Sequence, residues 1–312
     1  MVLDALAALG LLRGGSPWYR ARVRRKLERA SWRAENFSRA VGARHRMCRN
    51  CGALIPAKES ACPRCGASMR GVPRGGAGRL LRGILPAFGS VSATLLGVIA
   101  TVYLASAVAS PAPGSLLAPS GEILAKLGAM NLHWLVIGGQ WWRVVNPIFL
   151  HGGLLHVGFN AYVLSVIGPL IEAEIGRRKF LVLFIGTGIA SFLGSALASI
   201  FIPRWSVGAS GALFGLIGFG IVAGFRRPRG LLRQAAPQLV MWAAINFIIG
   251  FGLGFVDNAA HLGGLAAGAL AGLWITGPGV RGVLEDRLWT LAAWVAGFLP
   301  VVGLLSALLT AG

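Results

Sequence analysis

Four side chains suited to hydrolytic chemistry lie in otherwise apolar parts of the sequence: Ser210, His261, His156 and Asn160. A serine hydroxyl is a weak nucleophile until a base removes its proton. A neutral histidine can remove that proton and later protonate a leaving amine. The second histidine and the amide are donors of the kind that stabilises a developing oxyanion. Together these residue types predict acyl transfer by a serine and histidine dyad.

Each of these residues also has a structural interpretation when it is taken singly. A serine in a membrane helix usually bonds back to a carbonyl oxygen, and a lone histidine usually holds helices together. Their presence together at one depth favours catalysis. Asp257 lies four residues before His261, so it either orients the imidazole as a third member or caps the helix; we prefer the cap, and therefore a dyad.

Membrane-spanning helices are the elements that must position these residues. Of the 312 residues, 55% are apolar and 13% are charged, whereas a soluble domain carries about 25% charged residues. Seven uncharged stretches are each long enough for a helix of about 20 residues, which crosses a hydrocarbon core of about 30 Å. These stretches are 83–121, 144–171, 180–203, 205–225, 234–256, 258–280 and 288–312.

The second, fourth and sixth stretches are predicted to carry the four residues to one shallow layer. His156, Ser210 and His261 each lie within about two turns of the outer end of their helix, roughly 5 to 10 Å deep at about 1.5 Å per residue. Glycines at four-residue intervals let the fourth and sixth helices approach closely. These glycines are Gly211 and Gly215 in the fourth stretch, and Gly264, Gly268 and Gly272 in the sixth.

The charge of the chain predicts its orientation. Residues 1–82 hold 18 of the 30 basic residues and 4 of the 10 acidic ones. Basic segments are retained in the cytoplasm, so we expect a cytoplasmic N-terminus and, after seven spans, a C-terminus outside. The three inner loops are also basic. The expected partner of the basic region is anionic lipid rather than nucleic acid, because retention on the cytoplasmic side is the commoner cause of such a charge in a membrane protein. No aromatic stacking platform surrounds its cysteines, which favours docking over nucleic-acid binding for this module.

The first outer connection, 111–142, is long and amphipathic. Glu122 and Lys126 are spaced for an ion pair on one helical face. We therefore expect an interfacial hairpin against the outer leaflet, with Trp134, Trp141 and Trp142 at the headgroup boundary.

All four cysteines form two CxxC pairs, each followed by glycine: Cys48, Cys51, Cys62 and Cys65. This spacing predicts a closed, tetrahedral structural zinc site. Two disulfides are the alternative, which a cytoplasmic location disfavours. A four-thiolate site leaves no open position for a substrate, so we expect this module to dock a partner rather than to catalyse.

These motifs together resemble the rhomboid family of intramembrane serine proteases, over residues 86–276. The matching residues are Trp142 and Arg143; His151, His156 and Asn160; Gly168 and Glu172; Gly208, Ala209, Ser210 and Gly211; and Ala260, His261, Leu262, Gly263, Gly264 and Gly268. The resemblance implies that Ser210 is the nucleophile, His261 the base, and His156 with Asn160 the oxyanion site. It also implies cleavage of single transmembrane helices of membrane proteins near their outer end, without a cofactor. Arg143 and Glu172 are expected to be structural.

The predicted fold is an all-α polytopic membrane protein: a rhomboid-like six-helix bundle plus a seventh C-terminal transmembrane helix, preceded by a small cytoplasmic zinc-binding module. The predicted regions are a basic helical region at 1–46, a zinc-ribbon-like module at 47–70, a linker at 71–85, the six-span core at 86–276, and a cytoplasmic loop with the seventh helix at 277–312. The main alternative is a rhomboid-like escort protein that binds membrane helices without cutting them. A transporter is disfavoured, because the functional-looking polar groups cluster on the outer side.

Overall fold

The structure is a computed structural model. It describes residues 45–47, 54–56, 59–60, 62, 90–111, 113–227, 230–252, 254, 256–275 and 283–310. The chain divides into two compact units, Met1–Gly71 and Val72–Gly312, and each is treated by itself.

The first unit contains a short antiparallel hairpin that the sequence analysis did not predict. Strand β1 (His45–Met47) pairs with strand β2 (Leu54–Pro56). Cys48 and Cys51 fall between these strands in the sequence and, like Cys65, lie outside the described residues. Cys62 lies within the described residues, and its side chain is buried. The predicted zinc site therefore stays a prediction.

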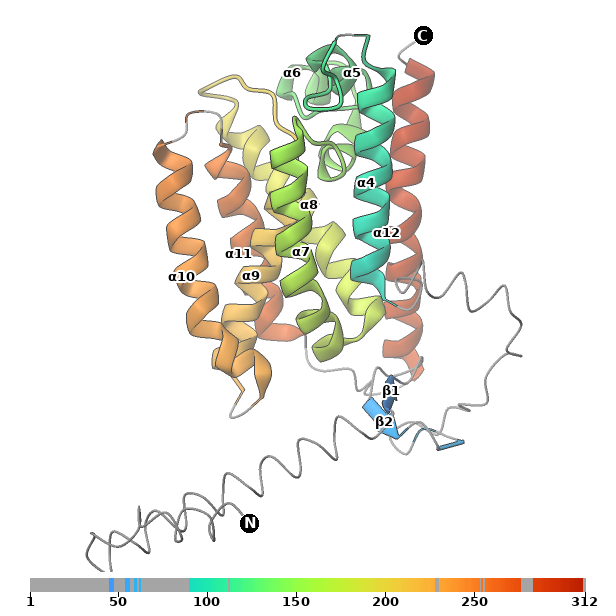
Figure 1. Cartoon of the computed structure of the whole chain (residues 1–312), viewed down its shortest axis with the longest axis vertical. Coiled ribbons are helices and arrows are strands. Elements are labelled where there is room, and N and C mark those ends of the chain that lie inside the picture. The colour runs from blue at the N-terminus through green and yellow to red at the C-terminus, as the bar shows by residue number, and fades with distance from the viewer. Residues whose placement is uncertain are drawn as a thin grey trace, which may run out of the picture. The chain divides into compact units, whose positions relative to one another are not determined.

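The second unit is a bundle of long helices with short helices at one end (Figure 1). The long helices are α4 (Val91–Ala109), α7 (Leu154–Ile175), α8 (Arg177–Ala198), α9 (Ser210–Phe225), α10 (Leu231–Gly252), α11 (Asn258–Trp274) and α12 (Val283–Thr310). The short ones are α5 (Gly121–Lys126) and α6 (Leu132–Val136), followed by the 3-10 turns η2 (Trp141–Val144) and η3 (Asn146–Ile148). Each of the seven uncharged stretches thus overlaps one long helix.

Five of the described helices, α4, α7, α8, α10 and α12, are long and apolar enough to cross a membrane. Helix α9 is apolar but has only 16 residues. It lies at the centre of the bundle, where Leu216 and Phe219 are fully buried. The protein is therefore a multi-pass membrane protein, as predicted, while the seven-span count and the orientation of the termini stay predictions.

Bare glycine backbones hold α9 and α11 together. A Cβ atom added to Gly264 would overlap the carbonyl oxygen of Gly211, and one added to Gly268 would overlap that of Gly215. The two backbones are therefore in direct contact at two successive turns. This contact brings the first turn of α9 beside the first turn of α11.

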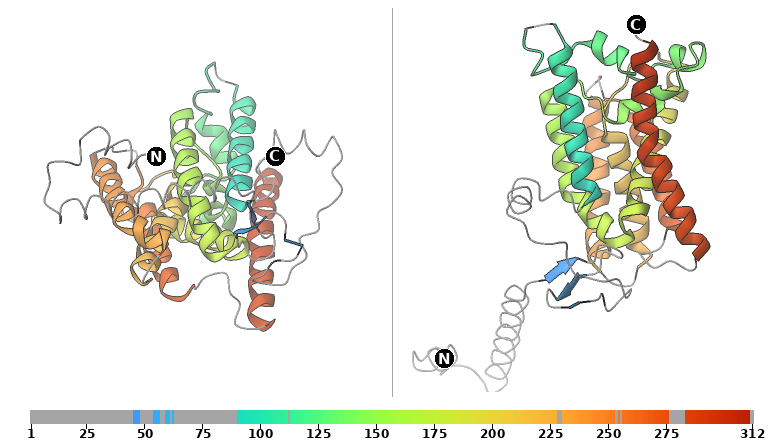
Figure 2. Two further views of the ribbon diagram at one scale, coloured as in Figure 1. Left: turned by 60° about the horizontal axis from the view of Figure 1, so that its bottom comes forward. Right: turned by 90° about the vertical axis from the view of Figure 1, so that its right-hand side faces the viewer.

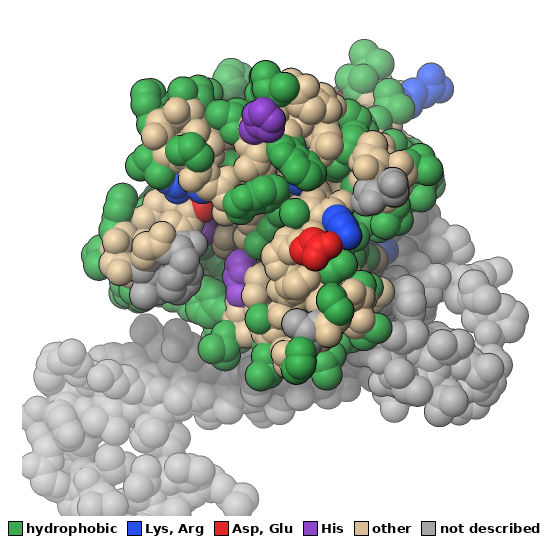
Figure 3. Space-filling view, turned by 90° about the horizontal axis from the view of Figure 1, so that it is seen from above, with side chains coloured by type: hydrophobic (Ala, Val, Ile, Leu, Met, Phe, Trp, Pro, Cys, Tyr) green, Lys and Arg blue, Asp and Glu red, His purple; other side chains and the backbone are tan. Residues whose placement is uncertain are grey.

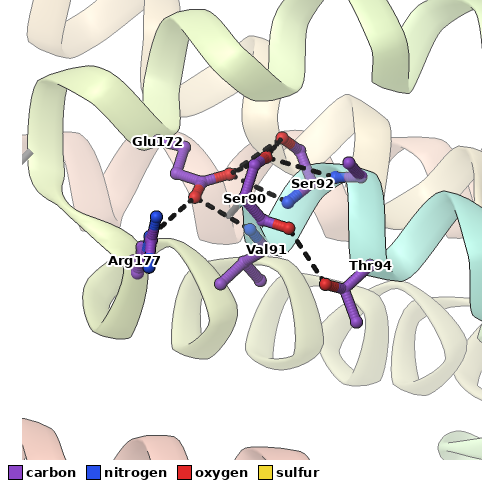
Figure 4. A network of polar contacts seen from close by, with 7 residues as sticks. Ser90, Val91, Ser92, Thr94, Glu172 and Arg177 are labelled. Carbon is purple, nitrogen blue, oxygen red and sulfur yellow. Dashed lines mark hydrogen bonds and ion pairs between the residues drawn. The ribbon is translucent and has the colours of Figure 1, made fainter. Parts of the chain in front are cut away.

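At the opposite end of the bundle, Glu172 of α7 caps the start of α4 (Figure 4). Its carboxylate accepts hydrogen bonds from the backbone N–H groups of Val91 and Ser92, both at 2.8 Å, and from the Ser90 and Ser92 hydroxyls. A carboxylate at a helix N-terminus satisfies backbone donors that lack partners within the helix. Glu172 thereby fixes α4 to α7, and the Arg177 guanidinium lies 3.8 Å away.

The structure corrects two expected positions. His151 was assigned to the second span, but α7 begins only at Leu154. An uncharged run does not reveal where its helix starts, and here Pro147 lies in the η3 turn while Gly153 is extended. Trp142 was expected at the headgroup boundary, but it is buried, with 7% of its surface exposed.

The buried position of Trp142 has a local cause. Gly128 lies so close that a Cβ atom there would be 3.0 Å from the indole Cδ1. Because glycine leaves that space free, the indole packs inward against Gly128 of the first outer connection, 111–142, which we call the first loop. The other two indoles of the loop, Trp134 and Trp141, are exposed, as an interfacial position requires.

Candidate active site

Ser210 and His261 meet where α9 and α11 begin. Ser210 is the first residue of α9, and its Oγ lies 2.9 Å from Nε2 of His261, one turn into α11. Phe214 stacks on the imidazole with ring centroids 4.2 Å apart, and Phe247 of α10 lies edge-on at 6.3 Å. The two rings limit rotation of the imidazole, so Nε2 remains directed at the hydroxyl.

The turn that leads into Ser210 requires a glycine. Gly208 has φ +126°, a conformation that side-chain-bearing residues rarely adopt. A Cβ atom at this position would also lie 2.6 Å from Nε2 of His156 and 3.7 Å from Oγ of Ser210. The absent side chain therefore leaves a space that the second imidazole and the hydroxyl both face.

The segment between η2 and α7 accepts two hydrogen bonds from the backbone of the same turn. The N–H of Gly208 donates to the carbonyl of Pro147 at 2.8 Å. The N–H of Ala209 donates to Nε2 of His151 at 3.3 Å. His151 must therefore be neutral with its proton on Nδ1, which faces the carbonyl oxygen of Phe149 at 3.3 Å.

His156 and Asn160 lie one turn apart on α7, as their spacing predicts. The Asn160 amide nitrogen donates to the carbonyl of His156 at 2.8 Å. Its Oδ1 is buried and has no hydrogen-bond partner in the described part of the chain. The imidazole faces the space beside Ser210 directly, whereas the amide would have to change partner to act there.

Asp257 caps α11 and does not contact the imidazole of His261. Its carboxylate accepts from the N–H of Ala260 at 3.1 Å and from the Ser195 hydroxyl of α8, and it pairs with Arg204 at 3.3 Å. Nδ1 of His261 has no hydrogen-bond partner within the described residues. Among the described residues, Ser210 therefore contacts His261 without a third side chain bonded to the imidazole.

Arg143 anchors the first loop beside this site. Its guanidinium donates to the carbonyl of Ala129 and to the side chain of Gln140, each at 2.6 Å, and lies 4.4 Å from the centroid of the Trp134 ring. Burial lowers the pKa of Arg143 to about 10, so it stays charged near neutral pH. Hydrophobic side chains cover much of the end of the bundle that carries the short helices α5 and α6 (Figure 3).

Sequence reasoning missed Asn146, which joins the first loop to α12. Its side-chain amide donates to the carbonyl of Leu127 at 2.9 Å and to that of Gly303 at 3.1 Å. A signal for it existed, because an amide inside the uncharged stretch 144–171 is costly unless it is satisfied. The partners are backbone atoms and left no such signal.

Comparison with known proteins places this site in a family context. A profile of the Rhomboid domain matches residues 138–278. The chain is 34% identical to Rhomboid protease GluP of Bacillus subtilis (strain 168) over 180 residues, 57% of this chain and 35% of that protein. It is 33% identical to Rhomboid-like protease 2 of Toxoplasma gondii over 190 residues, 56% of this chain and 61% of that protein.

A third relative is covered more fully. The chain is 31% identical to Putative rhomboid protease YdcA of Bacillus subtilis (strain 168) over 135 residues, 43% of this chain and 67% of that protein. Of the first two relatives it spans only 35% and 61% of their length.

Proposed function

The chain belongs to the rhomboid family, and from this membership we propose that it is an intramembrane serine endopeptidase. The proposed substrates are transmembrane segments of membrane proteins, cut near the outer membrane face. The observation that carries the proposal is the 2.9 Å separation of Ser210 Oγ and His261 Nε2. Because a helix shields its scissile amide until it unwinds, the substrate must be unwound there.

In the proposed reaction, Oγ of Ser210 attacks the carbonyl carbon of the scissile peptide bond while its proton passes to Nε2 of His261. The tetrahedral intermediate collapses, the C–N bond breaks, and His261 returns the proton to the leaving amine. Water, deprotonated by the same imidazole, then hydrolyses the acyl-enzyme. No cofactor takes part in these steps.

The developing oxyanion needs donors, and three are proposed. The backbone N–H of Ser210 lies at the N-terminus of α9, where the helix dipole favours negative charge. His156 faces the same space beside Gly208. Asn160 is the third donor, after its amide leaves the carbonyl of His156.

Purified protein in liposomes, mixed with a panel of reporter transmembrane helices, tests this function. Wild-type protein is expected to cut reporters that carry a helix-breaking residue near their outer end, and to react with a fluorophosphonate probe. The Ser210→Ala variant is expected to do neither. A wild-type protein inert in both assays would favour the escort function instead.

Asp257→Asn is expected to lower the cleavage rate by less than about tenfold. The carboxylate caps α11 and does not touch the imidazole of His261, whereas loss of a triad aspartate costs about 10⁴-fold. Initial rates on one reporter would measure this, with Glu122→Gln as control, because the Glu122 carboxylate is exposed on α5 and pairs with Lys126 at 2.8 Å. A loss near 10⁴-fold for Asp257→Asn, but not for the control, would instead support a triad in which Asp257 is the third member.

For the N-terminal unit we propose structural zinc and a cytoplasmic position, with the C-terminus outside. The β1–β2 hairpin, which brackets Cys48 and Cys51 in the sequence, supports the zinc proposal, as does the burial of Cys62. The metal would be held by four thiolates and would order a docking module. The basic residues of the chain support the orientation.

Elemental analysis of the purified full chain is expected to give about one zinc per chain. The double variant Cys48→Ser, Cys51→Ser is expected to lose the metal and to keep wild-type cleavage of detergent-solubilised reporters. This is expected because the predicted zinc site lies outside the helical unit that holds Ser210 and His261. Ser38→Ala and Ser60→Ala serve as control substitutions. Metal-free protein whose cysteines are joined in disulfides by mass spectrometry would refute the zinc site.

A further inference from the structure

Five residues form a close-packed contact between the first loop and the last helix, which we call the Asn146 junction. Its members are Leu127, Gly128, Trp142, Asn146 and Gly303. Asn146 donates to backbone carbonyls on both sides, one in the loop and one in α12. A Cβ atom added to Gly303 would lie 2.5 Å from Oδ1 of Asn146 and 3.3 Å from Cβ of Trp142. The junction therefore has no room for a larger residue.

The junction lies one residue from a contact that holds residues 206–209, the turn that leads into Ser210. We call these residues the nucleophile turn. Pro147 follows Asn146 directly, and its carbonyl accepts the N–H of Gly208, two residues before Ser210. Ser206 of the same turn is paired through both backbone groups with Met130 of the first loop, at 2.9 and 3.2 Å. A shift of Asn146 would therefore reach Gly208 through Pro147 and one hydrogen bond, and Ser210 follows two residues later.

Helix α12 is also fixed at its other end, so it is a defined element rather than a loosely placed one. Lys179 of α8 pairs with Glu285 at 3.4 Å and lies 5.4 Å from the ring centroid of Trp289. Arg178 pairs with Asp286. Figure 2 shows α12 running the length of the bundle, with its C-terminal end beside the short helices of the first loop. Contacts near both ends of α12 therefore determine where Gly303 lies.

We propose that Asn146 is a positioning residue for the nucleophile turn, and that α12 sets the placement of this turn through Gly303. The inference rests on the proposed protease function. According to this proposal, the packing of α12 controls the distance between Oγ of Ser210 and Nε2 of His261, in addition to placing the chain in the membrane. A misplacement of about 1 Å at a reacting group can cost about 100-fold in rate.

Gly303→Ala, compared with Gly297→Ala, is the decisive pair of variants. Both add one methyl group to α12, but at Gly297 the nearest atom is Cδ2 of Leu181 at 3.9 Å, so the methyl group fits. Gly303→Ala is expected to lower kcat by about 10- to 100-fold with KM changed less than about twofold. Labelling of Ser210 by a fluorophosphonate should slow by a similar factor, because the probe reports the nucleophile without a substrate helix. Gly297→Ala should match wild type in both.

Asn146→Ala provides a second route that does not add bulk. It removes both hydrogen bonds of the junction and is expected to lower kcat about tenfold, with the labelling rate. Residues in contact should behave non-additively, so the double variant Asn146→Ala, Gly303→Ala is expected to be no slower than the slower single variant. The Asn146→Ala result decides the question if Gly303→Ala fails to fold.

The outcomes separate the two proposals. Wild type that cuts and labels, with Gly303→Ala or Asn146→Ala indistinguishable from Gly297→Ala, would overturn the positioning role and leave the protease function standing. A loss confined to KM, or one fully explained by a smaller folded fraction in thermal melts, would also overturn it. Wild type that neither cuts nor labels would overturn the protease function itself.

Discussion

Ser210→Ala is expected to lower the rate of reporter cleavage by about 10⁴-fold or more, to the background of the assay. His261→Ala is expected to lower it to the same level, and the double variant to be no worse than either single one. Oγ and Nε2 are 2.9 Å apart and share one proton transfer, so neither retains its function without the other. Initial rates in liposomes, normalised to folded protein, measure all three.

Ser165→Ala is the matched control for this prediction. Ser165 also lies in a membrane helix, but its hydroxyl bonds back to the carbonyl of Tyr162 and faces away from the bundle. It should retain wild-type cleavage within about twofold. A His261→Ala variant that kept more than about a tenth of the wild-type rate would mean that another group takes the proton.

Residue periodicity made the helix contacts of the site predictable. Glycines four apart, such as Gly211 and Gly215, or Gly264 and Gly268, form a flat face on a helix, and a membrane helix gains from such a face by packing closely on another. Polar side chains in apolar stretches are costly, so their presence pointed to the site. The glycine signal depends on spacing along one helix, and the polar signal depends on the type of a single residue within an apolar stretch. Both can therefore be read from the sequence without coordinates.

The support of the nucleophile turn could not be predicted in this way. Gly208 is held by the carbonyl of Pro147, and Asn146 by that of Gly303. Backbone atoms are present at every residue, so such contacts leave no mark in the composition or the spacing. The position of His151 outside α7 was missed for a related reason, because hydropathy averages over a stretch and does not resolve where a helix begins.

Gly264→Ala is expected to lower cleavage by at least about 100-fold. The added Cβ would overlap the carbonyl oxygen of Gly211, a backbone atom that cannot move unless α9 and α11 separate. Gly211 follows Ser210, and Gly264 lies three residues after His261, so any separation lengthens the distance between Oγ and Nε2. Overpacking of this kind also destabilises a fold by about 1–3 kcal/mol.

Gly186→Ala isolates the steric effect from the general effect of an added methyl group in a membrane helix. Gly186 lies in the middle of α8 and has no atom within 4 Å of an added Cβ, so this variant should cut at the wild-type rate. Cleavage rates together with thermal melts in detergent separate misplacement from unfolding, since Gly264→Ala should remain slow even when the rate is divided by the folded fraction. If folded Gly264→Ala protein cut as fast as Gly186→Ala, the backbones of α9 and α11 would not be in contact at this turn, and the proximity of Ser210 and His261 would need a different cause.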